Sequence, residues 1–346
     1  MLVPIPGIRV YIFCRILTRG STGSDVNKSN IFLFLAIAAL PANVALAQAY
    51  PSKPIRVIDG FPAGGSTDIV ARIIAAKFQE SQGQPWIVDN RAGAQGIIGG
   101  ELAAKAPPDG YTLLMFTTTF TLHPAIYKNM PFDVTKAFVG VIQTSTITNV
   151  LAVHPSVPAR TVKELIALAK AKPGRLNFAA GGTGPQMTGE LFNSMAGVKI
   201  THIPYKGGAP AVAAAVGGEA DLTFATMPTA ISHIRSGRLR ALGACTATRT
   251  MLMPDLPTIA EAGVPGYDAP NSVGVLAPAG TPREIVVKLQ QEIARILAIR
   301  EVQDRLLTAG IEPSSMKPEQ FTEHIRAEVA KWTKVVKAAG LELQSY

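Results

Sequence analysis

The chain has 346 residues, of which 47% are hydrophobic, 16% are charged and 6% are aromatic, and its formal net charge is +9. The basic residues are scattered and are not interleaved with aromatic ones, which excludes the basic stripe of a nucleic-acid-binding protein. A basic balance of this kind helps to attract anionic solutes but carries no information about the fold.

Residues 1–47 are typical of a secretory signal peptide. Four basic residues precede the apolar run 31–40, and small residues around Ala47 suit a signal peptidase, with cleavage after Ala47 or Ala49. The apolar run is too short to span a bilayer comfortably. Residues 1–25 extend the charged region beyond its normal length, so we interpret them as a spurious N-terminal extension. We expect a mature protein in the periplasm.

Without this leader the chain has a net charge of +6, and Cys245 is its remaining cysteine. A single cysteine cannot form an internal disulfide, and the sequence supports neither a cysteine metal site nor a Cys/His catalytic pair. About 300 residues are ample for a large core and, at ordinary domain sizes, suggest two domains.

The first part of the mature chain alternates strands and helices, which predicts a mostly parallel sheet with helices on both faces. The expected strands are 55–58, 86–89 and 112–116, and the expected helices are 69–79 and 97–104. Thr117, Thr118 and Thr119 follow the third strand at its carboxyl end. There they either offer hydroxyls to a ligand or continue the strand.

The loop 61–68, between the first strand and the first helix, predicts an anion-binding site. Gly64 and Gly65 let the backbone turn, and the three residues after them are types that cap a helix. The free N–H groups of the first turn and the helix dipole favour a carboxylate or a phosphate. An ordinary strand-to-helix turn is the alternative, because the loop lacks the dinucleotide and P-loop patterns. The carboxylates of Asp68 and Asp59 favour a ligand with a hydrogen-bond donor beside its acid group, or an ordered water that relays the contact.

A second, similar unit begins near Val150. A strand over 176–180 enters another glycine loop, 181–186, which leads into a helix over 187–195. A ligand held between the two glycine loops would meet backbone donors from both sides. Further strands are expected at 151–153, 200–203, 221–224, 239–245 and 273–276, and further helices after Thr161 and at 209–216, 285–297 and 321–338.

An ordered series of motifs runs through the mature chain: Tyr50-Pro51, 61–68, Asn90-Arg91 with Gly93 and Gly96, 108–113, 204–207, Gly217-Gly218 with Asp221-Leu222, Leu256-Pro257-Thr258, Glu261-Ala262-Gly263 and 276–282. With this series the chain resembles the tripartite tricarboxylate transporter substrate-binding receptors, the Bug (Bordetella uptake) family. The resemblance covers nearly all of the mature chain.

The resemblance implies a two-lobed α/β fold of the type II periplasmic binding proteins. In this Venus flytrap, two crossing strands join the lobes, and each lobe is a mostly parallel sheet flanked by helices. Lobe 1 is expected to comprise residues 48–149 and 274–346, and lobe 2 residues 150–273. The resemblance also implies a monomeric receptor that binds a small carboxylate and delivers it to the membrane permease of a tripartite tricarboxylate transporter. It implies no enzymatic activity, metal or cofactor.

Ligand-binding residues are implied in both lobes. In lobe 1 they are Phe61, Ala63, Gly64, Gly65, Ser66, Thr67 and Asp68, and in lobe 2 they are Gly182, Thr183, Gly184, Tyr205, Lys206, Gly207 and Asp221. Thr117 and Thr118 complete the expected set. Core packing is the alternative for Tyr205, and a solvated loop position is the alternative for Lys206.

Four departures from the family pattern lie near the expected cleft: Asp59-Gly60, the contracted run Pro185-Gln186-Met187, Ala225, and Asn271-Ser272-Val273. Because pocket contacts set specificity, the identity of the carboxylate stays open.

Two other functions are compatible with parts of the pattern. The same fold can present its ligand to a membrane sensor instead of a permease. A periplasmic hydrolase could use Ser66 or another hydroxyl as its nucleophile, but the sequence has no G-x-S-x-G elbow and no histidine with triad or metal spacing.

Overall fold

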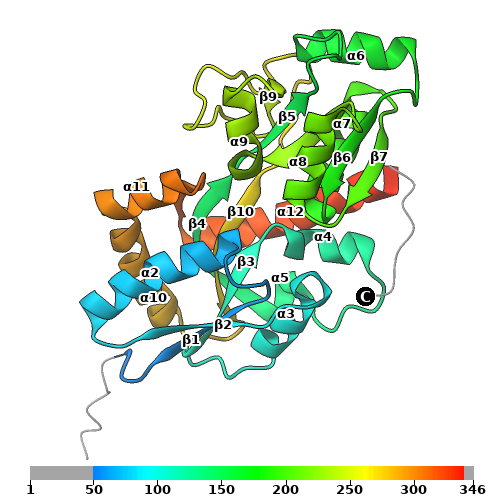
Figure 1. Ribbon diagram of the computed structural model, residues 1–346. Helices are drawn as coiled ribbons and strands as arrows, with labels where there is room; N and C mark the ends of the chain where they lie inside the picture. Colours follow the sequence, from blue (N-terminus) through cyan, green and yellow to red (C-terminus); the bar gives the residue numbers. More distant parts are fainter. Residues whose placement is uncertain (1–49, 339–346) are drawn as a thin grey trace, which may run out of the picture. The chain divides into compact units, whose positions relative to one another are not determined.

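The computed structural model describes residues 50–338 (Figure 1). The predicted signal peptide and the N-terminal extension lie outside the described residues. Within the described range, no helix combines the length and the apolar character needed to cross a membrane. Two separate β-sheets, each flanked by helices, confirm the predicted two-lobed α/β architecture.

The first sheet contains six strands: β1 (Ile55–Asp59), β2 (Trp86–Asn90), β3 (Thr112–Thr117), β4 (Phe138–Ile147), β10 (Asn271–Pro278) and β11 (Glu312–Met316). Their order is β11-β4-β10-β3-β1-β2. β1 to β4 run in one direction and β11 runs against β4, so the sheet is mixed, with three of its five strand pairs antiparallel, whereas a mostly parallel sheet was expected. β10 runs the opposite way between β3 and β4 and makes antiparallel pairs with both.

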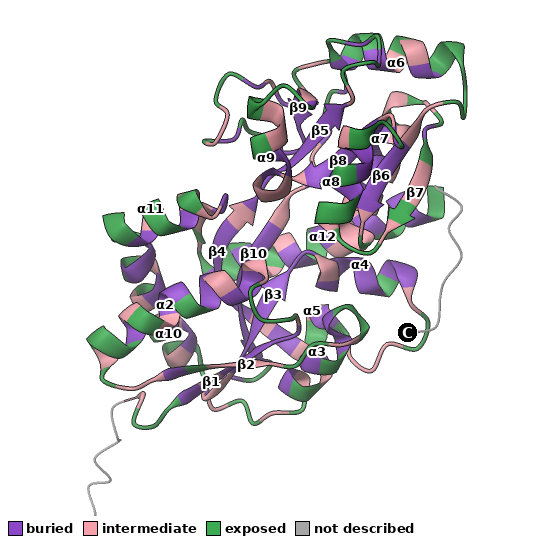
Figure 2. Ribbon diagram, viewed as in Figure 1, coloured by how far each residue is buried: buried purple, intermediate pink, exposed green. Residues whose placement is uncertain are grey.

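Helices cover both faces of the first sheet. Successive strand residues point to opposite faces, so Val57 and Ile58 join different cores. The core of Val57 includes side chains of α2 (Ser66–Gln82), α10 (Arg283–Leu297) and α11 (Arg300–Thr308). The core of Ile58 includes side chains of α3 (Ile97–Ala104), α4 (Thr119–Ile126), α5 (Val134–Ala137) and α12 (Pro318–Ala338). Figure 2 shows the buried strands between these helices.

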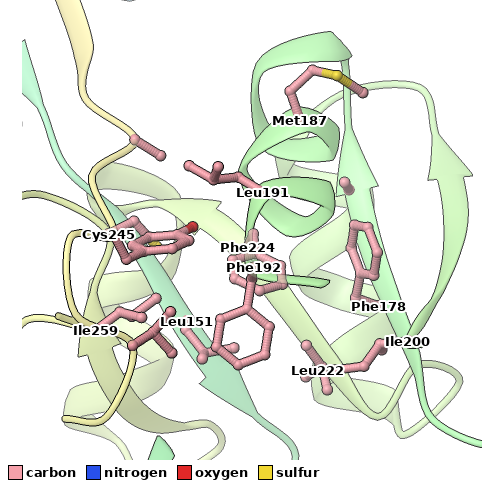
Figure 3. Packing of buried hydrophobic residues seen from close by; sticks show 14 of the residues in the cluster. Leu151, Phe178, Met187, Leu191, Phe192, Ile200, Leu222, Phe224, Cys245 and Ile259 are labelled. Carbon is pink, nitrogen blue, oxygen red and sulfur yellow. The ribbon is translucent and has the colours of Figure 1, made fainter. Parts of the chain in front are cut away.

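The second sheet contains five strands: β5 (Asn149–Val153), β6 (Asn177–Gly181), β7 (Thr201–Tyr205), β8 (Leu222–Thr226) and β9 (Arg240–Ala244). Their order is β7-β6-β8-β5-β9, and β5 runs against the others. One core contains side chains of α6 (Val162–Ala171) and α7 (Thr183–Ala196), where Phe178, Phe192 and Phe224 meet (Figure 3). On the other face pack α8 (Gly208–Gly217) and α9 (Met227–Arg235).

Strands and helices both connect the two sheets. β4 continues through Thr148 into β5, and the segment that follows β9 enters β10 at Asn271. α12 belongs to both cores, because Phe321 packs with the first sheet and Trp332 packs with the second. We call the first sheet with its helices lobe 1 and the second lobe 2; the residue boundaries expected for the lobes stay a prediction.

Several elements were not predicted from the sequence. The pattern of β4 is obscured because Gln143, Thr144 and Ser145 are polar, although they are buried between two neighbouring strands. α9, α11 and β11 are also additional to the prediction. α2 and α7 begin at Ser66 and Thr183, earlier than expected. Each glycine loop therefore runs directly into the first turn of its helix.

Candidate ligand-binding site

A cavity of about 150 Å³ lies between residues of the two lobes. The residues that line it are all uncharged: Gln95, Thr118, Thr119, Leu122, Asn149, Gly181, Gly182, Thr183, Gly184, Pro185, Thr188, Pro270, Asn271 and Trp332. Four of the residues expected to bind ligand meet here, namely Thr118, Gly182, Thr183 and Gly184. Their contact with a ligand stays a prediction.

The second glycine loop supplies one wall of the cavity at the start of α7. Gly182 is the N-cap residue, and its φ of 97° lies in the region that favours glycine. The N–H groups of Thr183 and Gly184 belong to the first turn, where the helix offers them no acceptor, and Pro185 has no N–H. The loop therefore presents two adjacent amide donors together with the positive end of the α7 dipole.

Gly181 allows the two loops of lobe 2 to lie against each other. A Cβ at this position would lie 1.9 Å from the carbonyl oxygen of Gly207. Gly181 also pairs with Tyr205 across β6 and β7. Tyr205, Lys206 and Gly207 do not line the cavity, and in this structure Tyr205 and Gly207 lie against the loop that does.

Thr117 and Thr118 attach the first sheet to the segment that returns from the second. The Thr118 hydroxyl donates to the Pro270 carbonyl at 3.2 Å and accepts from the Ser272 N–H at 2.8 Å. The Thr117 hydroxyl donates to Asn271 Oδ1 at 3.1 Å. Both hydroxyls are therefore engaged within the chain, and the polar group that this arrangement leaves for a ligand is the Nδ2 amide of Asn271.

Asn149, the first residue of β5, lies at the other strand crossing between the lobes. Its Nδ2 donates to Thr188 Oγ1 at 3.0 Å, and Thr188 Oγ1 donates to the Gly184 carbonyl at 3.0 Å. The residue is only 3% exposed, and Oδ1 finds no hydrogen-bond partner in residues 50–338. Two hydrogen bonds thus link this crossing to the first turn of α7.

The first glycine loop, 61–68, does not contribute to the lining of the cavity. Gly65 is the N-cap of α2 and offers no side chain, so the first-turn N–H groups of Ser66 and Thr67 have no acceptor within the helix. Thr67 and Asp68 are buried, whereas the loop residues that are exposed or half-buried are Phe61, Pro62, Ala63, Gly64, Gly65 and Ser66. A role for this loop in binding stays a prediction.

Asp68 is engaged within the chain. Its carboxylate accepts hydrogen bonds from the Gly64 N–H at 2.9 Å, from Arg72 Nε at 2.9 Å and from Asn90 Nδ2 at 3.0 Å. Burial alone would raise the pKa of Asp68, but these hydrogen bonds and the charge of Arg72 lower it. Asp68 therefore stabilises the loop through hydrogen bonds within the chain. The hypothesis that Asp68 requires a hydrogen-bond donor on the ligand is not supported.

Asp59, at the end of β1, is fully buried. It accepts from the Phe61 N–H at 3.1 Å and from the Thr67 hydroxyl at 2.9 Å, so it too needs no donor from a ligand. Burial raises the pKa of Asp59 to about 6, although both hydrogen bonds oppose the shift. The neighbouring Gly60 permits close contact with Gly96, because a Cβ on Gly60 would lie 2.8 Å from the Gly96 Cα.

Asp221 lies beside the first residue of β6, whereas the cavity lies at the other end of that strand. Its Oδ2 accepts from the Asn177 N–H at 2.9 Å, and its own N–H donates to Asn177 Oδ1 at 3.1 Å. Asn177 begins β6, whereas the cavity is lined by Gly181 at the end of that strand. Asp221 therefore connects the residue before β8 to the start of β6. This position does not support the expected contact with a ligand.

Comparison with known proteins identifies the family. The model of the tripartite tricarboxylate transporter family receptor matches residues 70–341. Protein BugT of Bordetella pertussis is 38% identical over 318 residues, which cover 91% of this chain and 97% of BugT. The chain belongs to the tripartite tricarboxylate transporter receptor family. The resemblance inferred from the sequence motifs is thus confirmed.

Solved structures of other receptors resemble this one along most of the chain. A protein of R. palustris with adipate is 36% identical, with a TM-score of 0.73 and coverage of 85% of this chain and 100% of that one. MatC from Rhodopseudomonas palustris with bound malate is 29% identical, with a TM-score of 0.69 and coverage of 83% and 100%. The two-lobed receptor fold predicted from the sequence is therefore confirmed.

Several residues that line the cavity were not predicted from the sequence, among them Gln95, Asn149 and Trp332. Gln95 and Ala94 have φ of 55° and 45°, values that strain a residue with a side chain and occur at ligand sites. The nearby Gly93 and Gly96 were the available signal. Asn149 gives no local signal, and Trp332 is one apolar position of a helix whose pattern indicates ordinary packing.

We expect Gly181→Ala to destabilise the receptor, because the added methyl group would force the loops at Gly181 and Gly207 apart. Overpacking of this kind lowers the free energy of unfolding by about 1–3 kcal/mol. Gly184→Ala is the matched control, since no atom lies within 4 Å of its added Cβ. Urea unfolding of both variants measures the difference, and equal stabilities would contradict the close contact.

Asp59 should make stability depend on pH. Its folded-state pKa of about 6 exceeds its ordinary value of 3.8, so the folded state binds the proton more tightly and loses stability as pH rises from 4 to 6. The loss is roughly 3 kcal/mol, and Asp59→Asn should avoid it. Urea unfolding at intervals between pH 4 and 7 should therefore show that the free energy of unfolding of the variant increases relative to that of the wild type as pH rises. A constant difference would refute the raised pKa.

Proposed function

We propose that this receptor works in the periplasm, captures a small carboxylate between its lobes and delivers it to a permease of the tripartite tricarboxylate type. The observation that carries the proposal is the uncharged cavity between the lobes, with the first turn of α7 in its wall. Receptors of similar sequence and fold hold adipate or malate, which are both carboxylates.

The first turn of α7 has the chemistry to hold a carboxylate. Two N–H donors, from Thr183 and Gly184, can each bond one acid oxygen, and a charge-assisted hydrogen bond contributes about 1.5–3 kcal/mol. The helix dipole adds a partial positive charge at the same place. The Asn271 Nδ2 amide offers a further donor from the returning segment.

Ligand binding is expected to favour closure of the lobes. The cavity is lined by Asn149 and Asn271, which lie at the two strand crossings, and by Trp332 of the helix that packs in both cores. A ligand that contacts both lobes and both crossings interacts differently with open and closed arrangements, which is the condition for a population shift. Closure would place the first glycine loop opposite the second.

A hydrolase has less support. The described Ser–His contact nearest to the cavity joins Ser272 Oγ and His324 Nε2 at 3.3 Å. Ser272 is only 1% exposed and is absent from the cavity lining, so a substrate cannot reach its hydroxyl there. For Ser66, the proposed nucleophile, the described residues offer no histidine partner. We therefore propose a receptor without catalytic activity.

Binding to backbone donors can be tested with two variants of one residue. Thr183→Pro removes the first amide donor at a helix position that proline favours, and the extended ψ of 170° at Gly182 suits a residue before proline. Thr183→Ala removes the hydroxyl but keeps the N–H. Calorimetry with malate, adipate and related acids should show at least a tenfold weaker Kd for Thr183→Pro than for Thr183→Ala.

Amide analogues of each acid provide the chemical control. They lack the negative charge, so they should not raise the melting temperature, whereas an acid at 100 times its Kd should stabilise the fold by about 2.7 kcal/mol. If no acid binds, or if the acid is consumed during incubation, the proposed receptor function is wrong.

A further inference from the structure

We propose that Asn149 selects ligands that carry a hydroxyl close to the carboxylate, so that the ligand of this receptor is a hydroxycarboxylate. The inference rests on the proposed function, because the same cavity holds the acid group. Its basis is the Asn149 side chain, which is 3% exposed, lines the cavity and has one polar atom without a partner.

The hydrogen bonds of Thr188 fix which end of the Asn149 amide is left over. The hydroxyl of Thr188 has a single proton, which it donates to the Gly184 carbonyl at 3.0 Å. It can therefore only accept from Asn149, and the Asn149 Nδ2 lies 3.0 Å from it. The Oδ1 atom remains as an acceptor without a donor among the described residues.

Hydrogen bonds hold both the main chain of Asn149 and the nitrogen end of its side chain. Asn149 pairs with Thr226 across β5 and β8, and its carbonyl accepts from the Cys245 N–H at 2.9 Å. Buried polar atoms without partners are rare in proteins. A ligand that carries a hydrogen-bond donor would give Oδ1 the hydrogen bond that it lacks. A ligand without a donor leaves Oδ1 unpaired, and sites built around a polar contact reject such analogues strongly.

The donor and the acid group must belong to one small part of the ligand. Asn149 bonds to Thr188, and Thr188 bonds to the carbonyl of Gly184, whose N–H belongs to the proposed acid site. The hydroxyl therefore lies on a carbon next to the carboxylate or one carbon further.

A hydroxyl fits the cavity better than an ammonium group does. The cavity lining contains no acidic side chain among the described residues, so a buried ammonium would lack a counter-charge. The two carboxylates near the first glycine loop do not provide one, because Asp68 is engaged with Arg72, and Asp59 is buried against Thr67.

Calorimetry with matched acids tests the inference. The pairs are lactate and propionate, 3-hydroxybutyrate and butyrate, and malate and succinate, with alanine and aspartate as ammonium-bearing probes. We expect the wild type to bind the hydroxy acid at least tenfold more tightly than its partner in one pair or more. Asn149→Leu, which keeps the volume but has no acceptor, should reduce that ratio to near one.

Thr223→Val is the control variant. It removes a buried hydroxyl that donates to the Ala179 carbonyl in the same sheet, outside the cavity, so it should leave the ratio unchanged. If Asn149→Leu does not fold, the wild-type ratios still decide whether the hydroxyl matters.

The outcomes separate the two proposals. Acids that bind without any preference for the hydroxyl overturn the inference and leave the receptor function intact. Tighter binding of the amino acids, or a preference that persists in Asn149→Leu, also overturns it. If no acid binds at all, the receptor function itself fails, and the inference fails with it.

Discussion

The charge of a bound carboxylate has to be balanced by backbone amides, because the described side chains that line the cavity are all neutral. The first turn of α7 is the feature that can do this, and the surrounding structure keeps it accessible. Gly182 supplies the positive φ that starts the helix, and Gly181 lets the neighbouring loop approach without a clash. A backbone site of this kind recognises an acid group through the positions of its N–H groups and through the helix dipole. Other contacts must then recognise the rest of the ligand.

Those other contacts lie where the lobes are joined. Asn149 and Asn271 stand at the two strand crossings, and Trp332 comes from the helix that packs in both cores. Both asparagines have one end of the amide engaged within the chain, by Thr188 and Thr117 respectively. The remaining ends differ in chemistry, since Asn149 offers an acceptor and Asn271 a donor. In the proposed receptor, recognition of the ligand and movement of the lobes would therefore depend on the same residues.

The sequence predicted the parts of this arrangement that are encoded locally. Glycines before a helix, capping residues and strand–helix alternation located both glycine loops and most strands. β4 was missed because Gln143, Thr144 and Ser145 interrupt its apolar pattern, and their burial depends on strands that lie far away in the sequence. The same limit applies to Asp59 and Asp68, whose partners were not visible locally, and to Trp332, whose place in the cavity depends on how α12 packs. The family resemblance supplied the fold and the function class but not these contacts.

Trp332 allows the central claim, that a carboxylate binds in this cavity, to be tested directly. The chain has two tryptophans, and Trp86 packs against Phe78 in the core of lobe 1. In a Trp86→Phe variant, the fluorescence therefore reports Trp332 alone. Titration with an acid that binds by calorimetry should change this fluorescence and give the same Kd. Calorimetric binding without any change in the emission of Trp332 would place the ligand elsewhere and contradict the account.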